Sequence, residues 1–323
     1  MKNPRVSVVI PTHNRARLIT RALDSLKNQT NQDFEIFIVD DASTDNTEEV
    51  IKNYNDSKIK YIRLSENVGQ SKARNIAIQQ ANGEYIGFLD SDDEWLPEKI
   101  ERQLKLFEQS KDPNLAAVYC GSLENDEIHN KTSIRNGGNV RGDIYVKLLS
   151  GFCPSTPTLF LVKKTVLHEV QGFDEYLPTF VDYDLWLRIA RLGHTFDVVD
   201  EPLIVKHEHA GSQIAKDPKK RERGLELFLE KWGEELIAKA GPQTYHNLRL
   251  KKLESLVTSI TNNPGDDYKK DASRSIKLLL GVRSRRINLY VKLIIMLLLT
   301  KGTLGYTKKL KSVFKREKKQ EVV

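Results

Sequence analysis

Residues 85–93 read YIGFLDSDD, an apolar run that passes directly into Asp90, Asp92 and Asp93. A short apolar run bounded by polar residues is typical of a buried strand. Ligands bind to open α/β sheets at the carboxyl ends of the strands. Carboxylates crowded there repel one another unless a cation lies among them. Ions such as Mg²⁺ bind few protein carboxylates and take phosphate oxygens of the substrate as further ligands. The stretch therefore predicts an α/β sheet, a divalent metal and a nucleotide or nucleotide-sugar substrate.

Outside this stretch, strand-like apolar runs alternate with helix-like segments. The expected strands are residues 6–10, 34–40, 59–64, 85–89 and 115–120, and the expected helices are residues 14–28, 44–54, 70–80 and 97–109. This alternation predicts a mostly parallel central sheet flanked by helices. Residues 125–143 are polar and contain glycine, which predicts a surface loop. A strand at 158–162, a helix at 182–192 and a strand near 196–206 are expected to complete the domain.

The composition is that of an ordinary globular protein. With 323 residues, 39% of them hydrophobic and 29% charged, the chain is long enough for one large domain and an appendage. We expect an α/β domain over residues 1–215, a helical extension over 216–286, and a short apolar helix with a basic tail over 287–323. Cys120 and Cys153 form no CxxC or Cys/His pattern, so we expect them to be reduced and buried.

The net charge of +7 is concentrated in residues 281–323, where Lys and Arg greatly outnumber acids. This basic segment surrounds LIIMLLL at 293–299, which is too short for a membrane span. The pattern predicts an anchor on an anionic membrane surface rather than nucleic-acid binding. The alternative is a last helix packed on the domain. Because the apolar stretch at the N-terminus is too short for a signal peptide, we expect a cytoplasmic protein, peripheral on the inner face of the membrane.

Each of the first four expected strands ends in a distinct motif. The motifs are PTHNR at 11–15, VDDASTD at 39–45, ENVGQSKARN at 66–75 and DSDD at 90–93. The carboxyl ends of parallel strands lie side by side, so these motifs are expected to converge. Each motif alone is weak evidence, because VDDAS is also typical of a helix cap and a single DxD of a solvated turn.

In this order and spacing the motifs resemble glycosyltransferase family 2, whose catalytic domain has the GT-A fold. The resemblance covers about residues 5–213 and extends to GFDE at 172–175 and DYDLWLRIARLG at 182–193. It implies nucleotide binding by Pro11, Thr12, Asp41, Gly69, Arg74, Asn75 and Asp90. It also implies that Asp92 holds Mg²⁺ or Mn²⁺ on the diphosphate, with His207 as a second metal ligand. For Asp93, a supporting role in the site and a helix cap both stay open.

The resemblance places the catalytic base at Asp182. A carboxylate at a helix N-terminus is favoured in its ionised form, which suits a group that accepts a proton. Asp184 is the competing acid, but the two side chains point about 200° apart on a helix, so only one can face the site. We interpret Asp184 as a structural partner of Arg188. The family usually has Glu directly before the base, where this chain has Val181.

The implied function is inverting, metal-dependent transfer of a sugar from a nucleoside-diphosphate sugar to an acceptor hydroxyl. The family's usual setting implies a glycan or lipid-linked acceptor in cell-surface polysaccharide or lipid-linked glycan assembly. The QxxRW motif of processive relatives is absent after residue 213, which predicts one or few sugars per encounter. Two alternatives stay open: a non-catalytic nucleotide-sugar-binding protein at the membrane, and a nucleotidyltransferase, although PTHNRARL lacks the glycines that the latter needs. The absence of GxxxxGK excludes a P-loop kinase.

Overall fold

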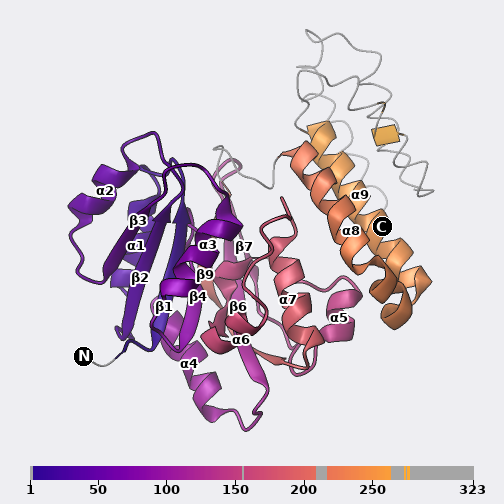
Figure 1. The fold of residues 1–323 in the computed structure, drawn as a ribbon, viewed down its shortest axis with the longest axis horizontal. Coiled ribbons are helices and arrows are strands. Elements are labelled where there is room, and N and C mark those ends of the chain that lie inside the picture. The colour runs from indigo at the N-terminus through magenta and orange to yellow at the C-terminus, as the bar shows by residue number, and fades with distance from the viewer. Residues whose placement is uncertain (1–2, 155, 209–216, 263–272, 274, 277–323) are drawn as a thin grey trace, which may run out of the picture.

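The computed structural model describes residues 3–154, 156–208, 217–262, 273 and 275–276 (Figure 1). Its strands are β1 (Val6–Thr12), β2 (Phe34–Asp40), β3 (Ile59–Arg63), β4 (Tyr85–Phe88), β5 (Glu94–Trp95), β6 (Leu115–Asp126), β7 (Lys131–Arg135), β8 (Leu161–Lys163) and β9 (Thr195–Glu208). Its helices are α1 (Ile19–Lys27), α2 (Thr47–Tyr54), α3 (Gln70–Gln80), α4 (Lys99–Gln109), α5 (Tyr145–Leu149), α6 (Lys164–Glu169), α7 (Val181–Arg191), α8 (Pro218–Ala240) and α9 (Pro242–Asn262), with a 3-10 turn at Pro157–Leu159.

The strands form one sheet in the order β3-β2-β1-β4-β8-β6-β9-β5, and β7 pairs with β6. Strands β3, β2, β1 and β4 are parallel to their neighbours, and β6 is parallel to β9. Strand β8 lies antiparallel between β4 and β6. The parallel pairing brings the carboxyl ends of the first four strands to one edge, which confirms the expected α/β architecture.

Every residue of β1 and β2 is buried, as expected for parallel strands covered on both faces. Helix α3 packs on these two strands, and α4 packs on β6 and β9. At Gly87 of β4, an added Cβ would lie 2.6 Å from the ring of Trp95, a nearly fully buried residue. The absence of a side chain at Gly87 therefore leaves room for the Trp95 ring against β4.

The structure corrects two expected elements and adds two short helices. Helix α1 begins at Ile19 rather than at residue 14, because Asn14 has a φ of 53° and its side chain binds the next loop instead. The expected surface loop at 125–143 contains β7, which pairs with the end of β6. The short helices α5 and α6 were not expected. Both cysteines are free, as expected. Cys120 is buried as expected, whereas Cys153 is only half-buried.

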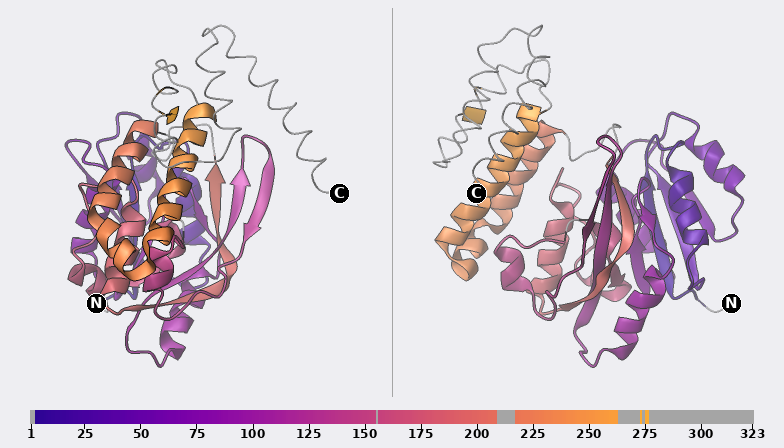
Figure 2. Two further views of the ribbon diagram at one scale, coloured as in Figure 1. Left: turned by 90° about the vertical axis from the view of Figure 1, so that its right-hand side faces the viewer. Right: turned by 180° about the vertical axis from the view of Figure 1, so that it is seen from behind.

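Helices α8 and α9 form an antiparallel pair beside α5 and α7, at the opposite end of the molecule from β2 and β3 (Figures 1 and 2). They account for the described part of the expected extension at 216–286. The expected boundary at 215–216, the apolar run at 293–299 and the basic tail lie outside the described residues. Among the helices that the structure describes, none combines the length and the apolar character that a membrane crossing needs.

Candidate functional site

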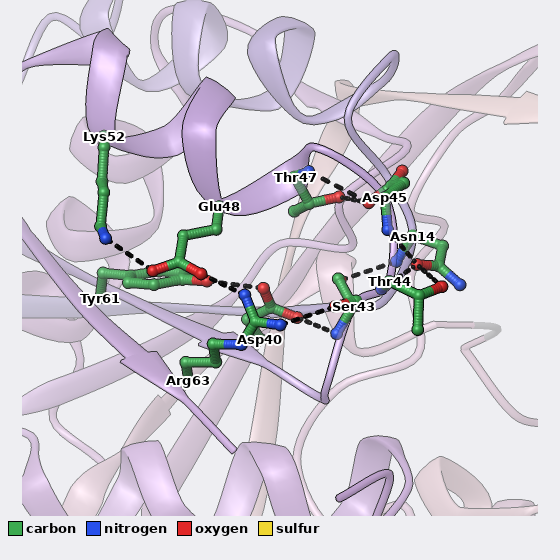
Figure 3. A network of polar contacts seen from close by, with 10 residues as sticks. All are labelled: Asn14, Asp40, Ser43, Thr44, Asp45, Thr47, Glu48, Lys52, Tyr61 and Arg63. Carbon is green, nitrogen blue, oxygen red and sulfur yellow. Dashed lines mark hydrogen bonds and ion pairs between the residues drawn. The ribbon is translucent and has the colours of Figure 1, made fainter. Parts of the chain in front are cut away.

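The loops that follow β1 and β2 are joined by a network of hydrogen bonds (Figure 3). The side-chain oxygen of Asn14 accepts hydrogen bonds from the backbone N–H groups of Thr44 (2.7 Å) and Asp45 (3.2 Å). In return, the backbone N–H of Asn14 donates to the Ser43 hydroxyl at 2.9 Å. The buried Asp40 carboxylate accepts from the backbone N–H of Ser43 at 2.8 Å and from Tyr61. The motifs PTHNR and VDDASTD therefore form one rigid surface at the sheet edge.

Asp41 connects this surface to the third motif. Its two carboxylate oxygens accept hydrogen bonds from the backbone N–H groups of Val68 (2.6 Å) and Gly69 (2.9 Å). Gly69 has a φ of 87°, a conformation that favours glycine, and it directly precedes α3. Asp41 is thus a structural bridge between the ends of β2 and β3, a role that the sequence analysis did not anticipate.

Arg74 connects the third motif to the acid run. Its guanidinium forms a 2.6 Å ion pair with Asp90, and the Arg74 side chain is only 2% exposed. The other oxygen of Asp90 accepts a hydrogen bond from the Thr156 hydroxyl at 3.1 Å, and the backbone N–H of Asp90 donates to Thr158. The Arg74 guanidinium also lies 5.2 Å from the Phe173 ring. With the hydrogen bonds of Asn14 and Asp41, this pair completes a chain of contacts that joins the four strand-end motifs.

Asp182 lies in the first turn of α7 and is partly exposed. Burial by the surrounding protein raises the pKa of Asp182, the nearby Asp90 carboxylate adds to this increase, and the Arg74 cation opposes it. Asp182 is thus within electrostatic reach of both members of the Arg74–Asp90 pair. The structure brings the expected base to the same site as the strand-end motifs.

Asp184 points away from this site into the protein. It is fully buried, and its carboxylate binds Arg188 (2.7 Å), Lys231 (2.7 Å) and the indole N–H of Trp232 (2.9 Å). The expected structural pairing of Asp184 with Arg188 is confirmed. The additional partners on α8 show that Asp184 fastens that helix to α7.

The acid run supplies oxygen ligands suited to a divalent cation. Asp93 is 3% exposed, and burial, followed by the neighbouring Asp90 and Asp92 carboxylates, raises its pKa well above the ordinary value. Asp92 is partly exposed. Within the described residues, no three His, Cys, Asp or Glu side chains gather closely enough to enclose a metal by themselves. The donor set fits an ion that takes few protein ligands and completes its shell with phosphate oxygens and water.

His207 lies beside the acid run, since its backbone N–H donates to Asp93 at 3.2 Å. Its ring, however, is held between two carboxylates: Nε2 is 2.7 Å from Glu94 and Nδ1 is 3.0 Å from Glu127. Arg21 binds Glu127 at 2.8 Å. Metal binding by His207 would require one of these contacts to be released. Sequence reasoning missed this cluster because Glu127 lies in the segment interpreted as a loop.

The structure also places the remaining expected nucleotide ligands. Pro11 and Thr12 are the buried last residues of β1, and the Thr12 hydroxyl has no hydrogen-bond partner within the part of the chain described. Asn75 lies on α3. Its side-chain oxygen accepts from the backbone N–H of Phe173 at 2.8 Å, and its side-chain N–H groups donate to the carbonyl oxygen of Phe173 at 2.9 Å and to Glu175. Asn75 therefore braces the GFDE turn at the border of the site, and nucleotide contact by all three residues stays a prediction.

The sequence matches known proteins over the part that carries the four strand-end motifs. A family model described as Glycosyl transferase family 2 matches residues 7–169. An uncharacterized glycosyltransferase of Methanocaldococcus jannaschii is 30% identical over 217 residues, which are 63% of this chain and 71% of that protein. Chondroitin synthase of Pasteurella multocida is 38% identical over 192 residues, which are 59% of this chain but 19% of the synthase. An uncharacterized glycosyltransferase of Rickettsia bellii is matched over 27% of its length, so the chain spans only a minor part of several curated relatives.

Two solved structures share the overall fold. The mannosyltransferase PcManGT from Pyrobaculum calidifontis, in complex with GDP-Man and Mn²⁺, matches with a TM-score of 0.59 and 19% identity, over 93% of this chain and 89% of that chain. S. aureus TarS 1–349, in complex with UDP-GlcNAc, matches with a TM-score of 0.57 and 18% identity, over 88% and 89%. At these identities the likeness shows the fold alone, and the expected GT-A fold is confirmed.

Proposed function

The chain belongs to glycosyltransferase family 2, and from this premise we propose that it is an inverting, metal-dependent transferase of one sugar from a nucleoside-diphosphate sugar to an acceptor hydroxyl. The observation that carries the proposal is the arrangement of Asp182, Arg74 and Asp90 at the edge where the four parallel strands end. That edge is where α/β sheets bind their ligands.

Asp182 is the general base of the proposed reaction. Its carboxylate takes the proton of the acceptor hydroxyl while the hydroxyl oxygen attacks the sugar carbon from the face opposite the leaving nucleoside diphosphate. One bond forms as the other breaks, so the anomeric centre inverts. Backbone hydrogen bonds in the first turn of α7 and the nearby Arg74 cation favour the ionised carboxylate, and they offset part of the increase in pKa that burial causes.

The donor binds along the strand ends in this proposal. Pro11 and Asp41 face the nucleotide base, and Thr12 is a further nucleotide contact. Asp41 accepts a base N–H through lone pairs that its two backbone hydrogen bonds leave available. The rigid loops on either side of Asp41 keep this edge preformed, which limits the entropy lost on binding. The remaining donor contacts are Gly69, Arg74, Asn75 and Asp90. The GDP-Man and UDP-GlcNAc complexes of the two structural neighbours support a nucleotide-sugar donor.

Asp92 would hold a Mg²⁺ or Mn²⁺ ion shared with the diphosphate, and His207 is the second candidate ligand. Such an ion supplies positive charge that stabilises the departing diphosphate. The Mn²⁺ in the mannosyltransferase structure and the oxygen-rich acid run support this assignment. Arg21 donates to the backbone carbonyl oxygen of Asp92 at 2.8 Å, which holds the backbone of the acid run at this position.

A glycan or lipid-linked acceptor, used in cell-surface polysaccharide or lipid-linked glycan assembly, completes the proposal. The proposal also includes a cytoplasmic location on the inner face of the membrane, where the basic residues near the end of the sequence hold the protein. Those residues lie outside the described part of the chain.

Donor turnover tests the proposed function. The purified chain is incubated with a panel of UDP-sugars and GDP-sugars, with Mn²⁺ or Mg²⁺ and an added glycan acceptor, and release of the nucleoside diphosphate is measured. We expect release from one donor class, its loss with a chelator, and a strong reduction in Asp92→Ala. Donor binding without release would favour a non-catalytic binding protein. Formation of pyrophosphate in a separate incubation with a nucleoside triphosphate and a sugar 1-phosphate would favour a nucleotidyltransferase.

The pH dependence of turnover reports on Asp182. Because its pKa is raised, mainly by burial, the carboxylate takes up a proton at a higher pH than an ordinary aspartate. A protonated base cannot accept the acceptor proton, so kcat is expected to fall with decreasing pH, with its midpoint above the ordinary range of aspartate. A kcat that stays constant down to that ordinary range would contradict the assignment.

A further inference from the structure

The helix pair α8–α9 brings one cation, Lys252, to the start of α7 and a second cation, Arg221, close to Lys252. Lys252 of α9 places its ammonium 5.3 Å from the ring centroids of both Phe180 and Tyr183. These two residues flank Asp182, the proposed base. Burial is the largest cause of the raised pKa of the Cys153 thiol. The nearby Asp182 carboxylate adds to this increase, and the nearby Lys252 ammonium opposes it. Lys252, Cys153 and Asp182 are therefore neighbours in space although they are far apart in the sequence.

Arg221 of α8 is the second cation. Its guanidinium donates a 3.0 Å hydrogen bond to the hydroxyl of Ser255. Ser255 lies three residues after Lys252 on α9, so both residues occupy the same face of that helix. Arg221 also lies close enough to Lys252 to lower the lysine's pKa. Arg221 and Lys252 are therefore neighbours, and Lys252 is the one that lies beside Asp182.

Both cations are partly desolvated. Burial lowers the pKa of Arg221, and burial is also the largest cause of the lowered pKa of Lys252. Within the part of the chain that the structure describes, neither residue forms an ion pair with a carboxylate. The Asp182 carboxylate offsets part of the Lys252 charge, and Arg221 donates to the neutral Ser255 hydroxyl. Two cations and one carboxylate leave a net positive charge, which a bound anion would stabilise. Both side chains are nevertheless partly exposed, so a ligand can reach them.

Other residues attach the helix pair to the rest of the protein. Phe228 of α8 packs on the rings of Phe180 and Tyr183 at centroid distances of 5.5 and 4.9 Å. Asp184 binds Lys231 and Trp232 of α8. A small apolar cluster of Leu225, Leu253 and Leu256 also packs against Phe180. These contacts hold the helix pair in place without the charges of Lys252 and Arg221, so the two cations can bind a ligand.

We propose that Lys252 and Arg221 form an acceptor subsite that binds an anionic group, a carboxylate or a phosphate, on a sugar whose hydroxyl faces Asp182. This inference rests on the proposed function for the identity of the reaction, but the subsite itself is defined by the two cations. Ammonium and guanidinium groups bind both anions through charge-assisted hydrogen bonds. The acceptor class that follows is a uronic-acid-containing or phosphate-containing glycan.

Ligand-observed NMR on the full chain tests the subsite without a known donor. The probes are glucuronic acid, glucose 6-phosphate and, as the neutral control, glucose. We expect the wild type to bind at least one anionic probe more tightly than glucose, and the stronger of the two identifies carboxylate or phosphate as the ligand. Removal of either charge in Lys252→Gln or Arg221→Gln is expected to raise the Kd for that probe about tenfold, a typical effect of losing one charge-assisted hydrogen bond.

Two further variants separate a specific site from general charge attraction. Lys251→Gln removes the same charge from the exposed neighbouring position and is expected to leave the Kd unchanged. Lys252→Arg keeps the charge and is expected to retain binding. Equal binding of all three probes by the wild type, or unchanged binding of the anionic probe in the Lys252→Gln/Arg221→Gln double variant, would overturn the inference. Donor turnover is measured separately, so a failure of the proposed function is distinguishable from a failure of the subsite.

Discussion

Asp182→Asn is expected to lower kcat by roughly a hundredfold to ten-thousandfold, the usual contribution of a general base. The amide keeps the size and shape of the side chain but cannot accept the proton of the acceptor hydroxyl. Because Asp182 is proposed to face the acceptor rather than the nucleotide, the Kd for the donor should change little. Steady-state kinetics with the identified donor, together with calorimetric titration of that donor, measure the two quantities.

Asp184→Asn is the matched control for this substitution, since it removes a carboxylate from the same helix. Asp184 is fully buried and binds Arg188, Lys231 and Trp232, so its replacement should lower the midpoint of urea unfolding. Asp182→Asn should leave that midpoint nearly unchanged. Full turnover in Asp182→Asn, or a loss of donor binding as large as the loss of kcat, would contradict the role of Asp182 as the base.

Asp90→Ala is expected to destabilise the folded protein by about 3 kcal/mol, because it leaves a buried guanidinium without its partner. Arg74 is 2% exposed, its Nη2 lies 2.6 Å from Asp90, and its Nε is buried with no hydrogen-bond partner within the described residues. Urea unfolding followed by tryptophan fluorescence measures the loss, since Trp95, Trp186 and Trp232 are all buried.

The double variant Arg74→Met/Asp90→Ala tests the physical reason for that loss. It removes both charges, so it should be more stable than Asp90→Ala, although neither variant is expected to bind donor normally. If Asp90→Ala unfolds at the urea concentration of the wild type, the ion pair does not hold the strand ends together as described.

The strand ends were predictable because apolar runs followed by polar motifs are a local pattern. The prediction that PTHNR, VDDASTD and the acid run meet at one edge follows from parallel pairing alone, and the hydrogen bonds around Asn14, Asp41 and Arg74 confirm it. The predicted start of α1 was wrong by several residues, because the left-handed conformation of Asn14 depends on a hydrogen-bond partner in another loop. Local propensity carries no information about such a contact.

The parts of the site that depend on distant contacts were not predictable. The sequence indicated His207 as a possible metal ligand but did not indicate that Glu94 and Glu127 hold both ring nitrogens. Likewise, nothing in the helical pattern of α9 distinguishes Lys252 from its exposed neighbour Lys251. Only the packing of α8 and α9 against α7 places Lys252 beside Asp182.

The stereochemistry of the first product tests the central claim most directly. Proton NMR of the sugar transferred from an α-linked nucleotide sugar distinguishes the anomers by the coupling of the anomeric proton. Direct displacement with Asp182 as the base predicts a β-linked product from the start of the reaction. An α-linked first product would contradict this mechanism.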